Sequence, residues 1–82
     1  MRLDKFLKVS RIIKRRSVAN EACSLDRVIV NGKPAKPSKE IIAGDIVGVR
    51  FGDKNVSFRV LEVPAGNVSK DAADHLYEVV SE

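Results

Sequence analysis

The sequence predicts an α+β domain in which two N-terminal helices precede a small antiparallel sheet. Up to about residue 25, apolar side chains recur every three or four positions, which is the period of a helix. Beyond residue 26, apolar and polar residues alternate in short runs bounded by Gly, Pro and Asn, which is typical of strands. The 82 residues, 44% hydrophobic and 32% charged, match one globular domain, so we expect a single domain over residues 1–82.

The first helix is predicted over residues 3–10. Its apolar face is formed by positions three and four apart, namely Leu3, Phe6, Leu7 and Ser10. The opposite side, expected to face solvent, carries Asp4, Lys5, Lys8 and Arg11.

The second helix is predicted from Ser17, as the N-cap, to about Leu25. Its apolar stripe is expected to consist of Val18, Ala22 and Leu25, widened by Ala19 and Cys23. The small side chains in this stripe predict that the second helix packs closely against the first.

The sheet is predicted from four segments. In "RVIVNG", residues 27–32, two valines share one strand face and Asn31-Gly32 signals a turn. The segment 33–41 has two prolines and is predicted as an extended loop. Strands are expected within 43–51 and 55–63, joined by a hairpin at "GDKN". A short helix capped by Ser69 over 69–76 and a closing strand over 77–80 complete the chain.

Positive charge is concentrated at one end of the chain. The net charge is +4, and residues 1–16 hold seven of the 15 Lys and Arg residues but only one of the 11 acidic residues. Such asymmetry indicates a polyanionic partner bound by one face, although a solvated basic surface is the simpler alternative. A second alternative is that Arg2 or Arg11 pairs with Asp4 or Glu21 in an exposed salt bridge.

Phosphate is the anion that this pattern favours. A helix N-terminus has unpaired N–H groups and a positive dipole end, and guanidinium forks beside it match phosphate geometry. The candidate phosphate-binding residues are Arg2, Lys5, Lys8, Arg11, Lys14, Arg15, Arg16 and the cap Ser17.

Four stretches, "RLDKFL", "SRIIKRRSVANEA", "RVIVNGKPAKPS" and "GDIV", resemble the S4-type RNA-binding domain family across residues 2–51. This resemblance implies an alpha-L RNA-binding motif, in which a helix-turn-helix-like pair is followed by a small sheet. It also implies RNA contacts from the loop after the first strand, with Lys33 and Lys36 as secondary candidates; the alternative is an ordinary solvated lysine loop. Residues 55–80 resemble the C-terminal strand, helix and strand of short stand-alone members. Members usually have Gly where this chain has Asp26, a residue type that tolerates left-handed backbone better than most.

Among stand-alone members the chain resembles the RqcP-like family, which acts in ribosome-associated quality control. The resemblance implies binding to large-subunit rRNA, to peptidyl-site tRNA and to the large ribosomal subunit, in support of a protein that adds C-terminal alanine tails to stalled chains. We expect a cytoplasmic monomer with no cofactor and no membrane partner. The alternatives are a heat-shock-type recycling factor for large subunits carrying peptidyl-tRNA, a protein-interaction adaptor that uses a sheet edge, and a DNA-binding helix pair.

Catalysis is not expected. Cys23 and His75 are the only thiol and imidazole, and Cys23 falls on a predicted buried helix face. One Cys and one His do not form a metal-ligand pattern, and no P-loop glycine motif occurs. Gly44-Asp45 is interpreted as a turn and not as a general base.

Aromatic residues suited to base stacking are few. The chain has only Phe6, Phe51, Phe58 and Tyr77, and three of these fit core positions. Recognition is therefore expected to depend mainly on RNA shape and backbone phosphates.

Overall fold

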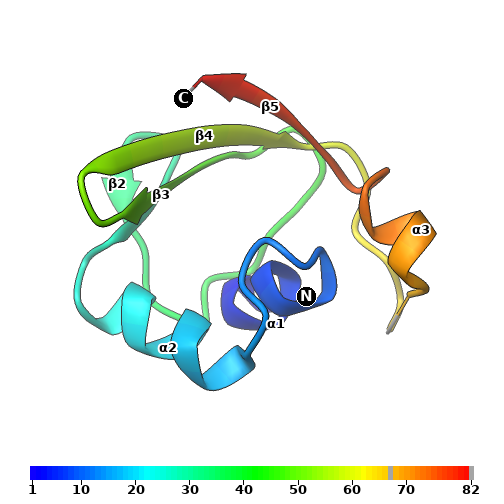
Figure 1. The fold of residues 1–82 in the computed structure, drawn as a ribbon, viewed down its shortest axis with the longest axis horizontal. Helices are drawn as coiled ribbons and strands as arrows, with labels where there is room; N and C mark the ends of the chain where they lie inside the picture. The colour runs from blue at the N-terminus through cyan, green and yellow to red at the C-terminus, as the bar shows by residue number, and fades with distance from the viewer. Residues whose placement is uncertain (67, 82) are drawn as a thin grey trace.

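A computed structural model describes residues 1–66 and 68–81 and confirms the predicted fold class. The helices are α1 (Leu3–Val9), α2 (Arg16–Ser24) and the short α3 (Lys70–Ala73). The strands are β1 (Val28–Val30), β2 (Lys33–Pro34), β3 (Ile46–Phe51), β4 (Lys54–Val60) and β5 (Tyr77–Ser81). Figure 1 shows α1 and α2 side by side beneath the sheet, with α3 at one end.

The strands form one antiparallel sheet in the order β2-β1-β3-β4-β5. Asn31 and Gly32 have φ values of 52° and 85° and join Val30 to its partner Lys33, so the predicted tight turn is confirmed. Positive φ at both central residues matches the twist of a hairpin. The prediction that residues 33–41 contain only loop is wrong at Lys33–Pro34, which pair with β1; Pro34 fits there because β2 is an edge strand.

The hydrophobic core lies between α1 and the helix-facing side of the sheet. Leu3, Phe6 and Leu7 are fully buried, as their spacing predicted. On the sheet, alternate residues of β3 and β4, including Val47 and Phe58, project into the same core. Removing these apolar surfaces from water is the main favourable contribution to folding.

The buried face of α2 is centred on other residues than predicted. Val18 and Leu25 are exposed, whereas Ala19 and Cys23, four residues apart, are buried against the core. The physical reason is the close approach of the two helices, which leaves room only for small side chains between them.

The end of α2 is a Schellman motif built on Asp26. Asp26 has a φ of 58°, its N–H donates to the Cys23 carbonyl at 3.2 Å, and the Arg27 N–H donates to the Ala22 carbonyl at 2.9 Å. These are the two hydrogen bonds of that motif, whose left-handed residue is usually Gly. The expected left-handed conformation of Asp26 is therefore confirmed.

The beginning of α2 differs from the prediction. Helix α2 starts at Arg16, with Arg15 in the N-cap position and in extended conformation, so Ser17 is a residue of the first turn and not the cap. The C-terminal elements follow the predictions more closely: the Ser69 side chain accepts a hydrogen bond from the Ala72 N–H and caps α3.

Candidate RNA-binding surface

Asp4 organises the start of α1. Its carboxylate accepts hydrogen bonds from the Arg2 side chain at 3.2 Å, from the Asn20 amide at 3.3 Å and from the Lys5 N–H at 2.8 Å. The Arg16 Nε lies 3.6 Å away. Asp4 is only 2% exposed, so its predicted position on the solvent side is wrong. The reason is tertiary: Asn20 and Arg16 of α2 pack over it, which the period of α1 cannot reveal.

The ionisation of Asp4 follows from opposing effects. Burial raises the pKa of the carboxyl. The hydrogen bonds from Asn20 and Arg2, together with the Lys5 N–H and the Arg16 charge, lower the pKa by more than burial raises it. The net pKa lies below the ordinary aspartate value. Asp4 is therefore a carboxylate at neutral pH, positioned between two guanidinium groups.

Arg2 and Arg16 are held by Asp4 but remain available to a ligand. Their side chains are 48% and 49% exposed. The alternative in which Arg2 pairs with Asp4 is the one observed, and Arg16 joins the same pair. One carboxylate cannot neutralise two guanidiniums, and each guanidinium has five N–H donors. The cluster keeps a positive charge with fixed geometry.

A second group of cations surrounds a shallow hollow of about 550 Å³ next to α1. It is lined by Lys8, Arg11 and Lys14 from the N-terminal region and by Lys70 from α3. Arg11 adopts a positive φ of 63°, and the hydrogen bond from the Ile13 N–H to the Leu7 carbonyl curls the loop back onto α1. Lys70 was missed by the sequence reasoning, because no local pattern places residue 70 beside residue 8.

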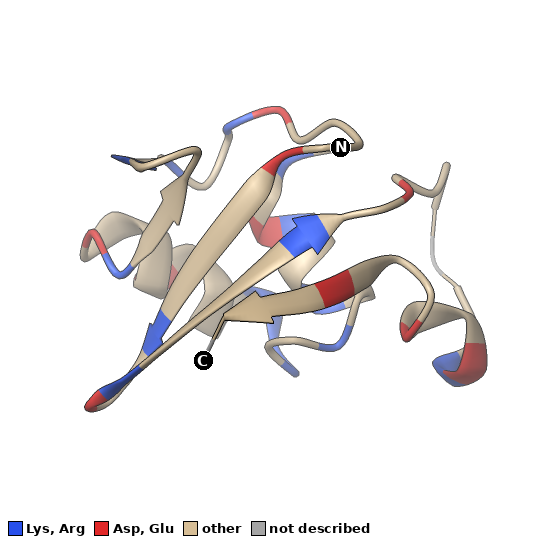
Figure 2. Cartoon of the chain, turned by 90° about the horizontal axis from the view of Figure 1, so that it is seen from above, with Lys and Arg blue, Asp and Glu red and all other residues tan. Residues whose placement is uncertain are grey.

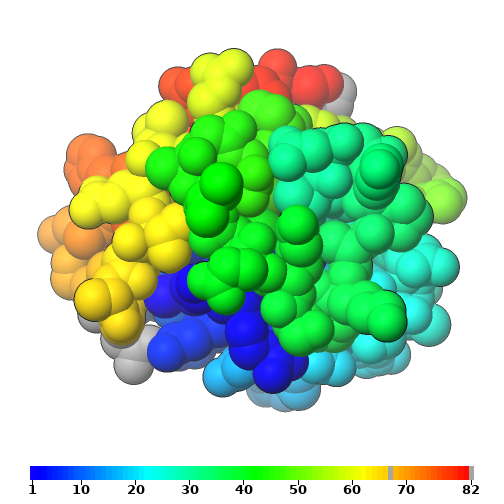
Figure 3. Space-filling model, turned by 180° about the vertical axis from the view of Figure 1, so that it is seen from behind, coloured from blue at the N-terminus to red at the C-terminus, as the bar shows by residue number. Residues whose placement is uncertain are grey.

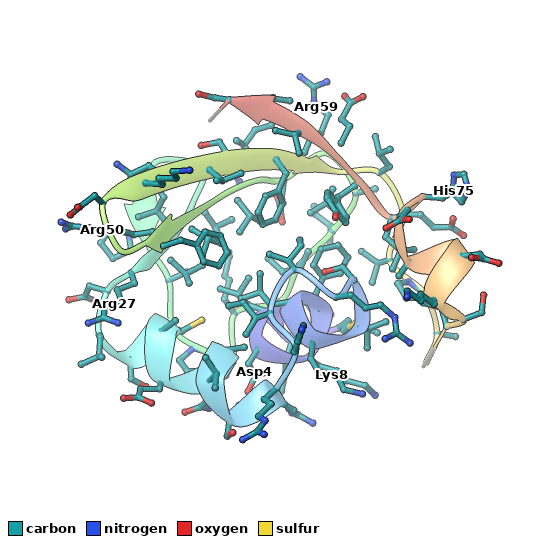
Figure 4. All side chains as sticks on the ribbon, in the orientation of Figure 1. Asp4, Lys8, Arg27, Arg50, Arg59 and His75 are labelled. Atoms are coloured by element: carbon teal, nitrogen blue, oxygen red, sulfur yellow. The ribbon has the colours of Figure 1, made fainter. Side chains whose placement is uncertain are left out.

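The two groups adjoin along α1. Asp4 and Lys8 are four residues apart, which puts them on the same helix face, and Figure 4 shows both on the lower side of α1. Lys5, which lies between Asp4 and Lys8 in the sequence, is half-buried. Arg15 and Ser17 are exposed at the start of α2. The Arg15 side chain makes no capping hydrogen bond there.

A third group lies on the loop that follows β2. Lys33, Lys36 and Lys39 line a hollow of about 340 Å³. The loop contacts the start of α1, because the Lys39 carbonyl accepts from the Leu3 N–H at 2.8 Å and the Pro37 carbonyl accepts from the Asp4 N–H at 3.1 Å. Figure 3 shows this green segment against the dark-blue N-terminus. The loop lysines thus lie near the Arg2 end of α1.

We call these three groups, together with Lys5 of α1 and Arg15 at the start of α2, the cationic surface. It comprises the predicted residues Arg2, Lys5, Lys8, Arg11, Lys14, Arg15, Arg16, Lys33 and Lys36, and beyond that predicted set Lys39 and Lys70.

Two ion pairs outside the cationic surface neutralise cations locally. Arg59 of β4 and Glu78 of β5 are paired at 2.5 Å, and Figure 2 shows neighbouring blue and red segments on these strands. The N-terminal ammonium pairs with Glu40. These two pairs neutralise Arg59 and the N-terminal ammonium, which therefore do not add to the positive charge of the helical side.

Cys23 and His75 do not form a catalytic pair. Cys23 is buried in α2, and burial together with the nearby Asp4 charge raises its pKa to about 11. His75 is exposed beyond α3, at the opposite end of the molecule (Figure 4). Asp45 is buried, and its carboxylate accepts hydrogen bonds from Asn31 and the Ile42 N–H, which supports its interpretation as a turn residue.

Residues 1–66 and 68–81 contain no group of three or more His, Cys, Asp or Glu side chains placed to hold a metal ion. None of the helices in this part of the chain has the length and apolar character needed to cross a membrane.

Comparison with known proteins identifies the family. The S4 domain matches residues 1–47. The "RQC P-site tRNA stabilizing factor" of Streptococcus pneumoniae (strain ATCC BAA-255 / R6) is 50% identical over 82 residues, covering 100% of this chain and 92% of the relative. This chain belongs to the S4-domain family. A protein of the same name from Halalkalibacterium halodurans is 49% identical over the same span, with 92% of that relative covered.

The fold of this S4-domain protein is also found in a solved structure. The trimeric structure of Vibrio cholerae Heat Shock Protein 15 has a TM-score of 0.89 at 30% identity and covers 98% of this chain and 81% of that chain. The resemblance to both groups of stand-alone S4-domain proteins is thereby confirmed.

Proposed function

We propose that this chain is an RNA-binding factor of ribosome-associated quality control, which stabilises tRNA in the peptidyl site of the large ribosomal subunit. The observation that carries the proposal is 50% identity, over the whole chain, to a protein named for that activity. The cationic surface supports it, since RNA affinity comes largely from neutralising phosphates and releasing their counterions.

The contribution of the chain is positional and not catalytic. Arg2 and Arg16, held by Asp4, present guanidinium donors in a fixed arrangement. Preorganised donors lose little conformational entropy when phosphate binds. We propose that they contact one RNA backbone while the group around Lys8 and Lys70 contacts a second, so that tRNA and large-subunit rRNA are held together.

The remaining assignments follow from the same role. We propose that residues 2–51 provide most of the RNA contacts, that Lys33 and Lys36 add secondary ones, and that the chain acts in the cytoplasm. The tail-adding protein would then extend the stalled chain with alanine while this factor holds the tRNA.

A second candidate function is recycling of large subunits that carry peptidyl-tRNA. The structural similarity to Heat Shock Protein 15, with a TM-score of 0.89, favours it. Both functions would use the cationic surface and would differ in the step after RNA binding.

Co-sedimentation with large subunits carrying peptidyl-tRNA tests the RNA-binding role. Lys8→Glu and Arg15→Glu should each abolish co-sedimentation, because both residues are exposed cations of the cationic surface. Lys54→Glu is the matched control, since Lys54 is an exposed lysine on β4 outside that surface. Arg16→Glu is unsuitable, as it would place a second carboxylate beside buried Asp4. Persistence of binding in both variants would contradict the proposal.

Reporter chains stalled in cells separate the two candidate functions. If the proposal holds, deleting the gene removes C-terminal alanine tails from the stalled reporter. If tails persist while peptidyl-tRNA accumulates on free large subunits, recycling is the function.

A further inference from the structure

A groove lies between the α1–α2 loop, the exposed side of α2 and the end of β3. Its volume is about 370 Å³. Its floor is apolar and includes Ile12, Val18 and Phe51, and its rim carries Lys14, Arg27 and Arg50. An apolar floor with a cationic rim is chemically distinct from the hollow around Lys8, whose lining is mainly lysine and arginine.

Phe51 is the aromatic residue that the core does not use. Phe6 and Phe58 are buried, and the Tyr77 ring packs on Phe58 with their centroids 5.5 Å apart. Phe51 is 42% exposed at the last position of β3, where it pairs with Lys54. Strand alternation puts it on the same side as Val47 and Val49, so its ring faces the helices.

Neighbouring apolar surface is left open beside this ring. Val18, on α2, is 47% exposed and lines the same groove. A ring with an adjoining aliphatic side chain forms a flat apolar patch on which a planar group can lie.

The two rim arginines come from neighbouring backbone segments, and the side chain of Arg50 is held by a backbone carbonyl. The Arg50 N–H donates to the Arg27 carbonyl at 2.9 Å, and the Arg50 Nε donates to the Gly52 carbonyl at 3.2 Å. Figure 4 shows both side chains at the same end of the molecule. Asp26 lies in the adjoining hollow, but among the described residues no ion pair joins a carboxylate to Arg27 or Arg50.

The groove is continuous with the cationic surface. Lys14 lines both the hollow around Lys8 and this groove. A phosphate backbone held at the first site can therefore pass Lys14 and reach the rim arginines. This continuity favours nucleic acid over a peptide as the occupant, because the groove offers positive charge on the path where a backbone would run.

We propose that this groove binds one unpaired nucleotide of the RNA, whose base stacks on Phe51 and whose flanking phosphates contact Lys14, Arg27 and Arg50. The proposal rests on the proposed RNA-binding function and adds a preference for RNA with an unpaired base. Stacking on an aromatic side chain tolerates any base, so the preference is for an unpaired nucleotide and not for a sequence.

Two RNA hairpins test the proposal with the full chain at low salt. They share one stem, and one of them carries a single unpaired 2-aminopurine. Wild-type protein should bind the bulged hairpin about 5- to 100-fold more tightly in fluorescence anisotropy, the range expected for one base–aromatic stack. Binding should also quench the 2-aminopurine fluorescence. Phe51→Leu should lose both effects, and Phe51→Tyr should keep both.

Controls distinguish a failure of the groove proposal from a failure of the RNA-binding function. Ile42→Ala, at an exposed apolar residue outside the groove, should keep the preference, and thermal melts should show that every variant is folded. Equal affinity of the wild type for the two hairpins would overturn the groove proposal but not the RNA-binding function. A preference for the bulged hairpin that is unchanged in Phe51→Leu would have the same consequence. Absence of binding to either hairpin and to large subunits would overturn both.

Discussion

Asp4 links the fold to the proposed RNA-binding surface. Its carboxylate connects α1 to α2 through Asn20 and holds Arg2 and Arg16 at the surface. A buried carboxylate with these partners gains more from hydrogen bonds and charge than it loses by leaving water, which is why its pKa falls.

The stability of the folded chain should depend on pH through Asp4. Because its pKa is lower in the folded than in the unfolded chain, the ionised carboxylate stabilises the fold above the ordinary aspartate pKa of about 3.9. This stabilisation is lost as the pH falls below that value through the lower folded-state pKa. Urea unfolding at pH 7 should show Asp4→Asn to be less stable by about 1–3 kcal/mol. Below about pH 4 the difference should shrink.

Asp71→Asn is the control for this experiment, since Asp71 is exposed in α3. A wild type and an Asp4→Asn variant that lose stability in parallel through the acid range would contradict the assigned role of Asp4.

Cys23 should be unreactive in the folded protein. Its thiol is buried and its pKa is raised to about 11, so little thiolate exists near neutral pH. Iodoacetamide at about pH 8 should label it much more slowly than a free thiol, whose pKa is about 8.5. In urea it should react at the rate of an unfolded chain. Rapid labelling without urea would show that the face of α2 that packs on α1 opens easily.

At the scale of the elements, the Schellman motif after α2 lowers the stability of the fold slightly, because it holds a residue other than Gly in the left-handed conformation. Asp26 occupies the left-handed position that Gly fills without steric penalty. Left-handed backbone costs an ordinary residue roughly 1–2 kcal/mol, and less for Asp.

Asp26→Gly should therefore stabilise the protein by up to about 1 kcal/mol, measured as the free energy of unfolding in urea. Asp74→Gly is the matched control. Asp74 likewise stands at a helix end, as the C-cap of α3, but has a φ of −67°, so Gly there should lower stability by adding freedom to the unfolded chain. A loss of stability in Asp26→Gly would mean that its carboxylate contributes more than the backbone costs.

At the scale of the whole molecule, the cationic surface is assembled from distant parts of the chain. Helix α1, the loop after β2 and helix α3 each contribute lysine or arginine to it. Among the described residues, the ion pairs of this surface join only Arg2 and Arg16 to Asp4, so a bound polyanion would relieve the repulsion between the other cations.

RNA binding should depend steeply on salt. If about 4–6 phosphates are contacted, the logarithm of the association constant should fall with the logarithm of salt concentration at a slope of roughly −3 to −5. Lys70→Ala should reduce the steepness by about one, whereas Lys54→Ala should leave it unchanged. Anisotropy titrations at several salt concentrations measure the slope. A flat response would contradict binding through phosphates.

Much of the fold could be predicted because its signals are local. The spacing of Leu3, Phe6 and Leu7 marks the buried face of α1, and Asn31-Gly32 marks a turn that requires positive φ. Ser69 marks the start of α3. Other predictions failed because packing decided them: Asp4 is covered by α2, and the α2 stripe consists of Ala19 and Cys23 because α1 lies so close.

By itself, the sequence determined the order of the elements apart from β2, the tight turn at Asn31-Gly32 and the concentration of positive charge in the first sixteen residues. Only the tertiary structure decided that Asp4 holds two arginines, that Lys70 joins Lys8, and that Phe51 remains open beside Arg27 and Arg50. The physical reason is that periodicity tells which side chains share a face of one element. Which other segment packs against that face depends on contacts between residues far apart in the chain.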